Sequence, residues 1–158
     1  MKRKLLVLVM ALASVAALTG CEKKDDKKEE GTTTVKTETK TLACSVTDDE
    51  ETLKFTFTFE GETYNKVVLS ETTKYKSEKD AKAAYEDDKE EVKEMNNYKG
   101  ISANAQQSGS STYNTATFKL AELDDNSKTI YNQVFKEVDG KSYDTIKADL
   151  EKAGYTCK

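Results

Sequence analysis

Residues 53–59 read LKFTFTF, and this stretch decides the fold. An apolar residue stands at every odd position and a lysine or threonine at every even one. A period of two in aromatic and β-branched residues is typical of an antiparallel strand with one face buried and the other in water. The sequence therefore predicts a half-buried strand that organises a sheet.

Further strands are predicted on both sides of this segment. Residues 42–46 alternate in the same way and are followed by an acidic turn at residues 48–51. Gly61-Glu62 can close a tight hairpin into a strand over residues 63–75. A second hairpin is expected over residues 101–105 and 116–120, around a turn at Gly109-Ser110-Ser111.

A long amphipathic helix is predicted between the two hairpins. Ser77 is followed three residues later by Asp80, which is a variant of the capping box. Side chains then recur at helical spacing to about Asn97, and they are Ala81, Ala84, Tyr85, Asp88, Val92 and Met95. We expect this helix to lie across the sheet.

Two shorter helices are predicted near the C-terminus. A polar break at residues 124–128 precedes residues 130–135, which fit a short helix better than a strand. Ser142 caps a last helix that runs through Ala153, with Gly154 at its C′ position. This order of elements predicts an α+β fold, with an antiparallel sheet of hairpins and helices packed on one face.

The N-terminus has the pattern of an export signal. Three positive residues precede the uncharged run 5–18, which is too short to span a membrane comfortably. Leu18-Thr19-Gly20-Cys21 then resembles a bacterial lipobox. This resemblance implies cleavage before Cys21 and attachment of a diacylglycerol to its thiol, with fatty acyl chains such as palmitate holding the protein on the membrane.

Two alternatives to the lipobox stay open at this point. The first is an ordinary cleaved signal followed by a chance cysteine, and the second is an uncleaved N-terminal anchor helix. The lipobox interpretation predicts a location on the extracytoplasmic face of the cell membrane, with lipid on Cys21 as the contact.

The chain divides into three parts. Residues 1–20 are the expected signal peptide, residues 21–41 the lipidated cysteine and a flexible charged and Thr-rich tether, and residues 42–158 a single α+β domain. The tether is predicted because EKKDDKKEE and GTTTVKTETKT have no apolar periodicity that could bury surface. A helix of ion pairs is the alternative for this segment, and it would be marginal without apolar anchors.

The net charge of the chain limits the classes of partner that it can bind. Without residues 1–20 the chain has 25 − 3 = 22 basic and 29 acidic residues, a net charge of −7. We therefore expect no nucleic-acid partner, because a polyanion would be repelled. An envelope protein or a small ligand remains as the expected partner.

Cys44 and Cys157 remain once Cys21 is assigned to lipid. They stand at the two ends of the folded region. Each is at the same alternate positions as the neighbouring residues expected in the core. A disulfide between them would close a loop of 157 − 44 + 1 = 114 residues. By lowering the entropy of the unfolded chain, a loop of this length stabilises the folded state by about 4 to 5 kcal/mol. A pair of reactive thiols is the alternative, although the spacing is not that of a CxxC motif.

Catalytic and metal-binding patterns are weak. The chain has no histidine, which excludes His-dependent triads and His metal sites. Acidic runs at 48–51, 86–88 and 124–126 invite a calcium interpretation, but Lys128 breaks the EF-hand order. The serines of 108–111 lack a base and are expected in a turn. We therefore predict no catalytic residue, no metal ligand and no cofactor.

Tyrosine is the remaining candidate for recognition. Tyr64, Tyr75, Tyr98 and Tyr113 could form a binding face, since tyrosine combines a large rigid area with a polar tip. Positions at the edge of the core are the alternative for most of them.

The folded region resembles the YehR-like family of small bacterial lipoproteins. The parallels are Thr72-Thr73-Lys74, Ser77-Glu78-Lys79-Asp80-Ala81, Asn97-Tyr98-Lys99-Gly100-Ile101 and Leu150-Glu151-Lys152-Ala153-Gly154-Tyr155. They extend over residues 42–157. The resemblance implies the α+β fold and the lipid-anchored location, and it supplies no active site, because the family is a domain of unknown function.

These observations together favour a non-enzymatic binding domain held outside the cytoplasm. Two other classes stay open: a His-free envelope hydrolase that uses carboxylates, and an inhibitor or immunity-type lipoprotein.

Overall fold

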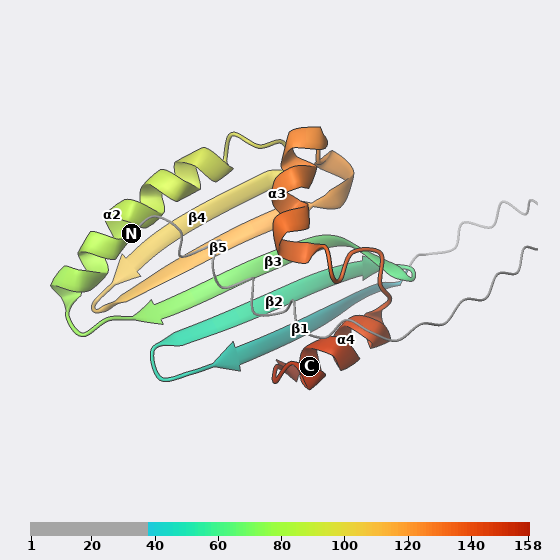
Figure 1. Ribbon diagram of the computed structural model, residues 1–158, viewed down its shortest axis with the longest axis horizontal. Coiled ribbons are helices and arrows are strands. Elements are labelled where there is room, and N and C mark those ends of the chain that lie inside the picture. The colour runs from blue at the N-terminus through green and yellow to red at the C-terminus, as the bar shows by residue number, and fades with distance from the viewer. Residues whose placement is uncertain (1–37) are drawn as a thin grey trace, which may run out of the picture.

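The computed structural model describes residues 38–158, which form a six-stranded antiparallel sheet with three α-helices (Figure 1). The expected signal peptide, Leu18, Thr19, Gly20 and Cys21 lie outside the described residues. Within residues 38–158, no helix combines the length and hydrophobicity that a membrane crossing needs. The predicted α+β class is confirmed.

The sheet has the strand order β4-β5-β3-β2-β1-β6, and each recorded pair is antiparallel. The strands are β1 (Thr39–Thr47), β2 (Glu51–Glu60), β3 (Thr63–Lys74), β4 (Ile101–Ser108), β5 (Ser111–Lys119) and β6 (Thr156–Cys157). The helices are α2 (Glu78–Met95), α3 (Asp125–Phe135) and α4 (Tyr143–Lys152), with a 3-10 turn, η2, over Leu120–Glu122.

Strand β2 lies inside the sheet and carries the LKFTFTF stretch. Phe55, Phe57 and Phe59 are at most 3% exposed, whereas Lys54 is exposed and Thr56 half-buried on the opposite face. This is the alternation that the sequence predicts.

Strand β1 begins earlier than expected. We placed the domain boundary at Leu42, but Thr39, Lys40 and Thr41 already pair with the end of the long strand β2. These residues have no apolar pattern of their own, so only the partner strand identifies them as a strand. The segment proposed as a tether therefore ends at Glu38.

The second hairpin is longer than its apolar positions indicate. Strands β4 and β5 extend to Ser108 and from Ser111, and the predicted turn closes them directly. Gly100 precedes β4 with φ +77°, and a Cβ there would lie 2.8 Å from the backbone carbon of Glu122. Glycine is thus required where the chain leaves α2 for the sheet.

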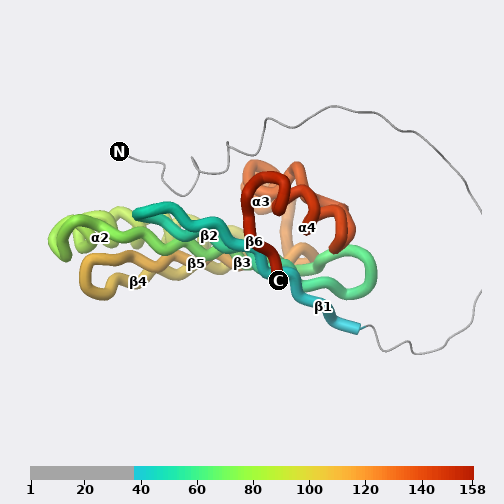
Figure 2. The backbone as a smooth tube through the Cα atoms, turned by 90° about the horizontal axis from the view of Figure 1, so that it is seen from below, coloured from blue at the N-terminus to red at the C-terminus, as the bar shows by residue number. Residues whose placement is uncertain are grey.

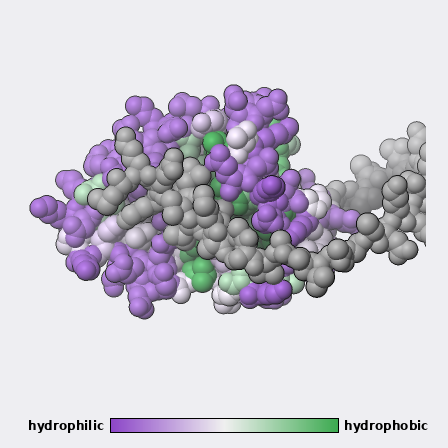
Figure 3. Space-filling view, in the orientation of Figure 1, coloured by the Kyte–Doolittle hydropathy of each residue, from purple (hydrophilic) through white to green (hydrophobic). Residues whose placement is uncertain are grey.

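Helix α2 starts as predicted. The Ser77 hydroxyl accepts a hydrogen bond from the Asp80 backbone N–H, at 3.2 Å. The helix packs on β4 and β5 and runs along this edge rather than across the whole sheet (Figure 1). Ala81 is its one fully buried residue, and the surface visible around the helix in Figure 3 is mostly hydrophilic.

Helix α3 corrects the sequence interpretation. The predicted polar break at 124–128 is the first turn of this helix, which begins at Asp125. The Asp124 carboxylate accepts hydrogen bonds from the backbone and the hydroxyl of Ser127 and so caps the helix. Polarity here marks a helix start, not a break.

Helix α4 and the core complete the domain. Ser142 caps α4, which ends at Lys152 with Ala153 as the C-cap. Helices α3 and α4 lie on one side of the sheet (Figure 2), and α2 joins that side through a hydrogen bond from Asn114 to Asp88. The core lies between these layers.

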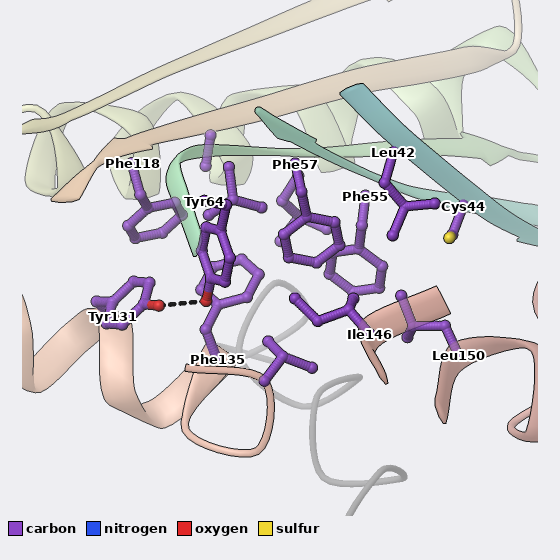
Figure 4. Packing of buried hydrophobic residues seen from close by; sticks show 14 of the residues in the cluster. Leu42, Cys44, Phe55, Phe57, Tyr64, Phe118, Tyr131, Phe135, Ile146 and Leu150 are labelled. Carbon is purple, nitrogen blue, oxygen red and sulfur yellow. Dashed lines mark hydrogen bonds between the residues drawn. The ribbon is translucent and has the colours of Figure 1, made fainter. Parts of the chain in front are cut away.

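Aromatic side chains dominate this core (Figure 4). Phe135 of α3 meets Phe55, Phe57 and Phe118 edge-on, with ring centroids 5.2 to 6.5 Å apart. Ile146 and Leu150 of α4 are 0% and 2% exposed. Edge-to-face aromatic packing therefore joins α3 to the middle strands of the sheet.

We predict that Phe57→Ala destabilises the protein by about 3 to 5 kcal/mol, because it leaves a cavity in this core. Urea unfolding measures the change. Thr56→Ala, on the other face of the same strand, is the matched control and should cost less than about 1 kcal/mol. Equal losses in the two variants would contradict the assignment of the buried face.

Candidate functional site on the two faces of the sheet

The C-terminal strand is held to the sheet by a cysteine pair. Cys44 of β1 and Cys157 of β6 are directly opposite in register, and their sulfur atoms are joined at 2.02 Å. The neighbouring residues Ala43 and Lys158 exchange two backbone hydrogen bonds, at 2.9 and 3.1 Å. The two-residue strand β6 has little pairing of its own, so the disulfide adds a covalent link between the segment after α4 and the sheet edge.

The helix-bearing face contains a cluster of acids at the α2 side. Glu71 of β3 is 9% exposed and accepts a hydrogen bond from the Thr73 hydroxyl at 3.2 Å. Burial, and the negative charges of Glu51, Asp88 and Glu91, raise the pKa of the Glu71 carboxyl to about 7. Glu71 can therefore hold a proton at neutral pH.

Two buried neutral side chains border this acid cluster. Asn114 of β5 lies opposite Glu71 in register, and its amide nitrogen donates to an Asp88 carboxylate oxygen at 2.9 Å. The Asn114 amide oxygen and the Thr112 hydroxyl have no hydrogen-bond partner among the described residues. These polar groups weaken the contact between α2 and the sheet, since buried polar atoms without partners destabilise a fold.

The structure brings together parts of two predicted acidic runs. Glu51 belongs to the run 48–51 and Asp88 to the run 86–88, and both act on Glu71, which the sequence analysis did not single out. Asp124 of the third run instead caps α3. Within residues 38–158, no three or more acidic or cysteine side chains are arranged to hold a metal ion.

Buried tyrosines form a hydrogen-bonded pair (Figure 4). Tyr131 donates to an Asp139 carboxylate oxygen at 2.8 Å, so the Tyr64 hydroxyl donates to that of Tyr131. Burial raises the pKa of Tyr64 to about 12 and that of Tyr131 further still. Both hydroxyls stay protonated and serve as structural groups.

The four tyrosines proposed as a binding face do not come together. Tyr64 is in the core, Tyr98 packs against it, and Tyr75 is half-buried directly after β3. Tyr113 is 42% exposed and points away from the helices, on the parity opposite to the buried residues of β5. Tyr113 is thus the candidate that remains for contact with a ligand.

The open face is the helix-free face of the sheet, formed by every second residue of β1–β5. Hydroxyl side chains fill its centre: β2 contributes Thr52, Thr56 and Thr58, and β5 contributes Thr115 and Thr117. In the part of the chain that the structure describes, no helix packs on this face.

Lysines lie among and beside these hydroxyl groups. Strand alternation places Lys54, Lys66, Lys74 and Lys119 on the open face, against Glu60 as the single acid that β1–β5 contribute to it. The open face is basic although residues 21–158 have an acidic excess. Sequence reasoning missed this site because it summed the charges and did not sort them by strand parity.

The comparisons with known proteins concern the fold. No protein-family model and no curated protein matches the chain. The NMR structure of a protein from Streptococcus pneumoniae TIGR4 matches with a TM-score of 0.61 and 14% identity, over 92% of this chain and 100% of that one. The NMR structure of E. coli YehR matches with a TM-score of 0.62 and 10% identity, over 78% of this chain and 93% of that one.

The chain has a YehR-like fold. Neither name states an activity, so both likenesses bear on the architecture alone. The fold places a buried acid cluster on one side of the sheet and the basic open face on the other.

We predict that replacing both Cys44 and Cys157 by alanine lowers the free energy of unfolding by about 3 to 5 kcal/mol, because the unfolded chain loses a long covalent loop. Urea unfolding measures this loss, and reduction of the wild type should reproduce it. Alkylation of either residue in unfolded, unreduced protein would contradict the pairing.

We predict that Glu71→Gln removes a pH dependence of stability. The folded pKa of about 7 lies above the ordinary value of 4.5, so wild-type stability falls as pH rises between these values. Relative to Glu71→Gln, the wild type should lose roughly 2 to 3 kcal/mol between pH 4 and pH 8.

Urea unfolding across this pH range tests the Glu71 prediction. Glu90→Gln, an exposed position of α2, is the matched control and should follow the wild type. A pH-independent difference between the wild type and Glu71→Gln would show that the Glu71 carboxyl does not titrate near neutrality.

Proposed function

We propose that the protein is a bacterial lipoprotein of the YehR-like family, anchored to the cell membrane through Cys21 and exposed on the extracytoplasmic face. The observation that carries this proposal is the Leu18-Thr19-Gly20-Cys21 sequence directly after the uncharged run 5–18. The Cys44–Cys157 disulfide supports it, since such bonds persist mainly in exported proteins.

The folded domain is proposed to bind a ligand rather than to catalyse a reaction. The open face supports this function, because it offers a broad array of hydroxyl groups with lysines and Tyr113 among them. Hydroxyls both donate and accept hydrogen bonds, which suits recognition of a polar partner.

A carboxylate-based hydrolase is the second candidate function. The acid cluster favours it, because a glutamate with a pKa of about 7 can act as a general acid. Binding is the better-supported function, since Glu71 lies under α2 and is only 9% exposed.

Substitution of Cys21 tests the anchor. We predict that the wild type incorporates radiolabelled palmitate in growing cells and that Cys21→Ala does not, because the thiol is the acceptor of the lipid. N-terminal analysis of the mature wild type should find a modified residue 21 as the first residue.

Thr32→Ala is the matched control for the anchor experiment, since it lies beyond the proposed cleavage site and should keep the label. Palmitate on Cys21→Ala, or a mature wild-type chain that starts at another residue, would contradict the lipid anchor. The uncleaved anchor helix would then be favoured.

A further inference from the structure

We propose that the open face binds a linear anionic polysaccharide. This inference rests on the proposed binding function and names the class of its ligand. It is carried by the arrangement of hydroxyls, lysines and one exposed tyrosine on the helix-free face of the sheet.

The hydroxyl rows provide the hydrogen bonds. Thr56 of β2 lies opposite Val68 of β3, which in turn lies opposite Thr117 of β5, while Ser70 and Thr115 form the next row. Neighbouring strands are about 5 Å apart and rows are about 7 Å apart along them, so the row of Ser70 and Thr115 has adjacent hydroxyls, while Val68 separates the hydroxyls of Thr56 and Thr117 by about 10 Å. A repeating polymer with hydroxyls on successive units can make the same contact many times on such a lattice.

The lysines indicate the charge of the ligand. Lys66 of β3 and Lys119 of β5 are direct cross-strand partners. Like charges in this position repel each other and destabilise the pair. Lys119 forms an ion pair with Glu122, at 3.1 Å. The ligand proposed here would place a carboxylate near the ammonium groups of both Lys66 and Lys119, and so offset the repulsion between them.

The basic character is local, which gives the face its selectivity. Helix α2, on the other side of the sheet, has eight acids against four lysines. A polyanion would therefore be repelled from the side with the acid cluster around Glu71 and attracted to the open face.

Tyr113 provides a surface for sugar rings. It lies between Thr72 of β3 and Gln106 of β4 in register. Its ring offers a rigid apolar area next to groups that form hydrogen bonds, which fits the C–H face of a sugar flanked by hydroxyls.

The same face is a poor match for a membrane surface. Basic faces that bind membranes carry Trp, Phe or Leu side chains for insertion. Tyr113 is the one large apolar residue that is exposed within residues 38–158. A hydrated glycan is thus favoured over the headgroups of an anionic bilayer.

The experiment uses the full chain purified from membranes with its lipid and held in a zwitterionic detergent. The probe is polygalacturonate, a linear glycan with a carboxylate on each sugar, and neutral dextran is the comparison polymer. Binding is measured by biolayer interferometry. Acetylation of lysines, read by mass spectrometry, locates the contact.

We expect polygalacturonate to bind and dextran not to bind, and the affinity should fall as salt is raised from about 50 mM to about 300 mM. The double variant Lys66→Gln/Lys119→Gln should raise the Kd at least about tenfold, which corresponds to about 1.4 kcal/mol. Polygalacturonate should shield Lys66 and Lys119 from acetylation in the wild type.

Lys82→Gln/Lys93→Gln on α2 is the matched control, because it removes the same charge from exposed positions on the other side of the sheet. It should leave the Kd unchanged. The open-face variant should keep the wild-type melting temperature or raise it, since it relieves a like-charge contact.

Three outcomes would overturn the inference: no binding of polygalacturonate by the wild type, equal binding of dextran, or an equal loss in the α2 variant. Shielding of Lys66 and Lys119 in phosphatidylglycerol nanodiscs but not by polygalacturonate would also overturn it, and would make the membrane the occupant. Palmitate labelling at Cys21 tests the anchor separately, so the two proposals fail by different observations.

Discussion

Burial of one face of β2 is the constraint on which the rest of the structure depends. Three phenylalanines at alternate positions must leave water together, and Phe135 of α3 and Ile146 of α4 come to cover them. Because side chains of a strand alternate, the threonines between them are placed on the other side at the same time. One apolar requirement therefore produces both the core and the open face.

Much of the fold follows from local patterns in the sequence. Strand parity around residues 53–59, the Ser77 and Ser142 caps and the two hairpin turns all agree with the structure. The failures have a common cause. Thr39–Thr41 are a strand only because β2 extends beside them, and Asp124 caps a helix whose first turn is polar. Pairing and capping override hydrophobicity in both places.

The candidate sites were less accessible to sequence reasoning than the fold. The acid cluster assembles Glu51, Glu71 and Asp88 from β2, β3 and α2, so it depends on a register that one sequence does not display. The open face is different, because each of its lysines stands at one of the alternate positions of its own strand that point away from the core. The alternation of these lysines is therefore visible in the sequence. The net charge does not show it, because that sum combines the residues on both faces of the sheet.

The attachment of β6 beside β1 has a mechanical consequence. A pull arriving from the N-terminal side enters the domain at Thr39, along the axis of a strand paired with β2 over its full length. Such a load acts in shear, so many backbone hydrogen bonds resist it together. At Cys44 the force has two paths. One continues along β1, and the other passes through the disulfide to Cys157 and the segment that follows α4. An anchor on the N-terminal side would therefore load this strand pair in shear, with the disulfide as a second path for the force.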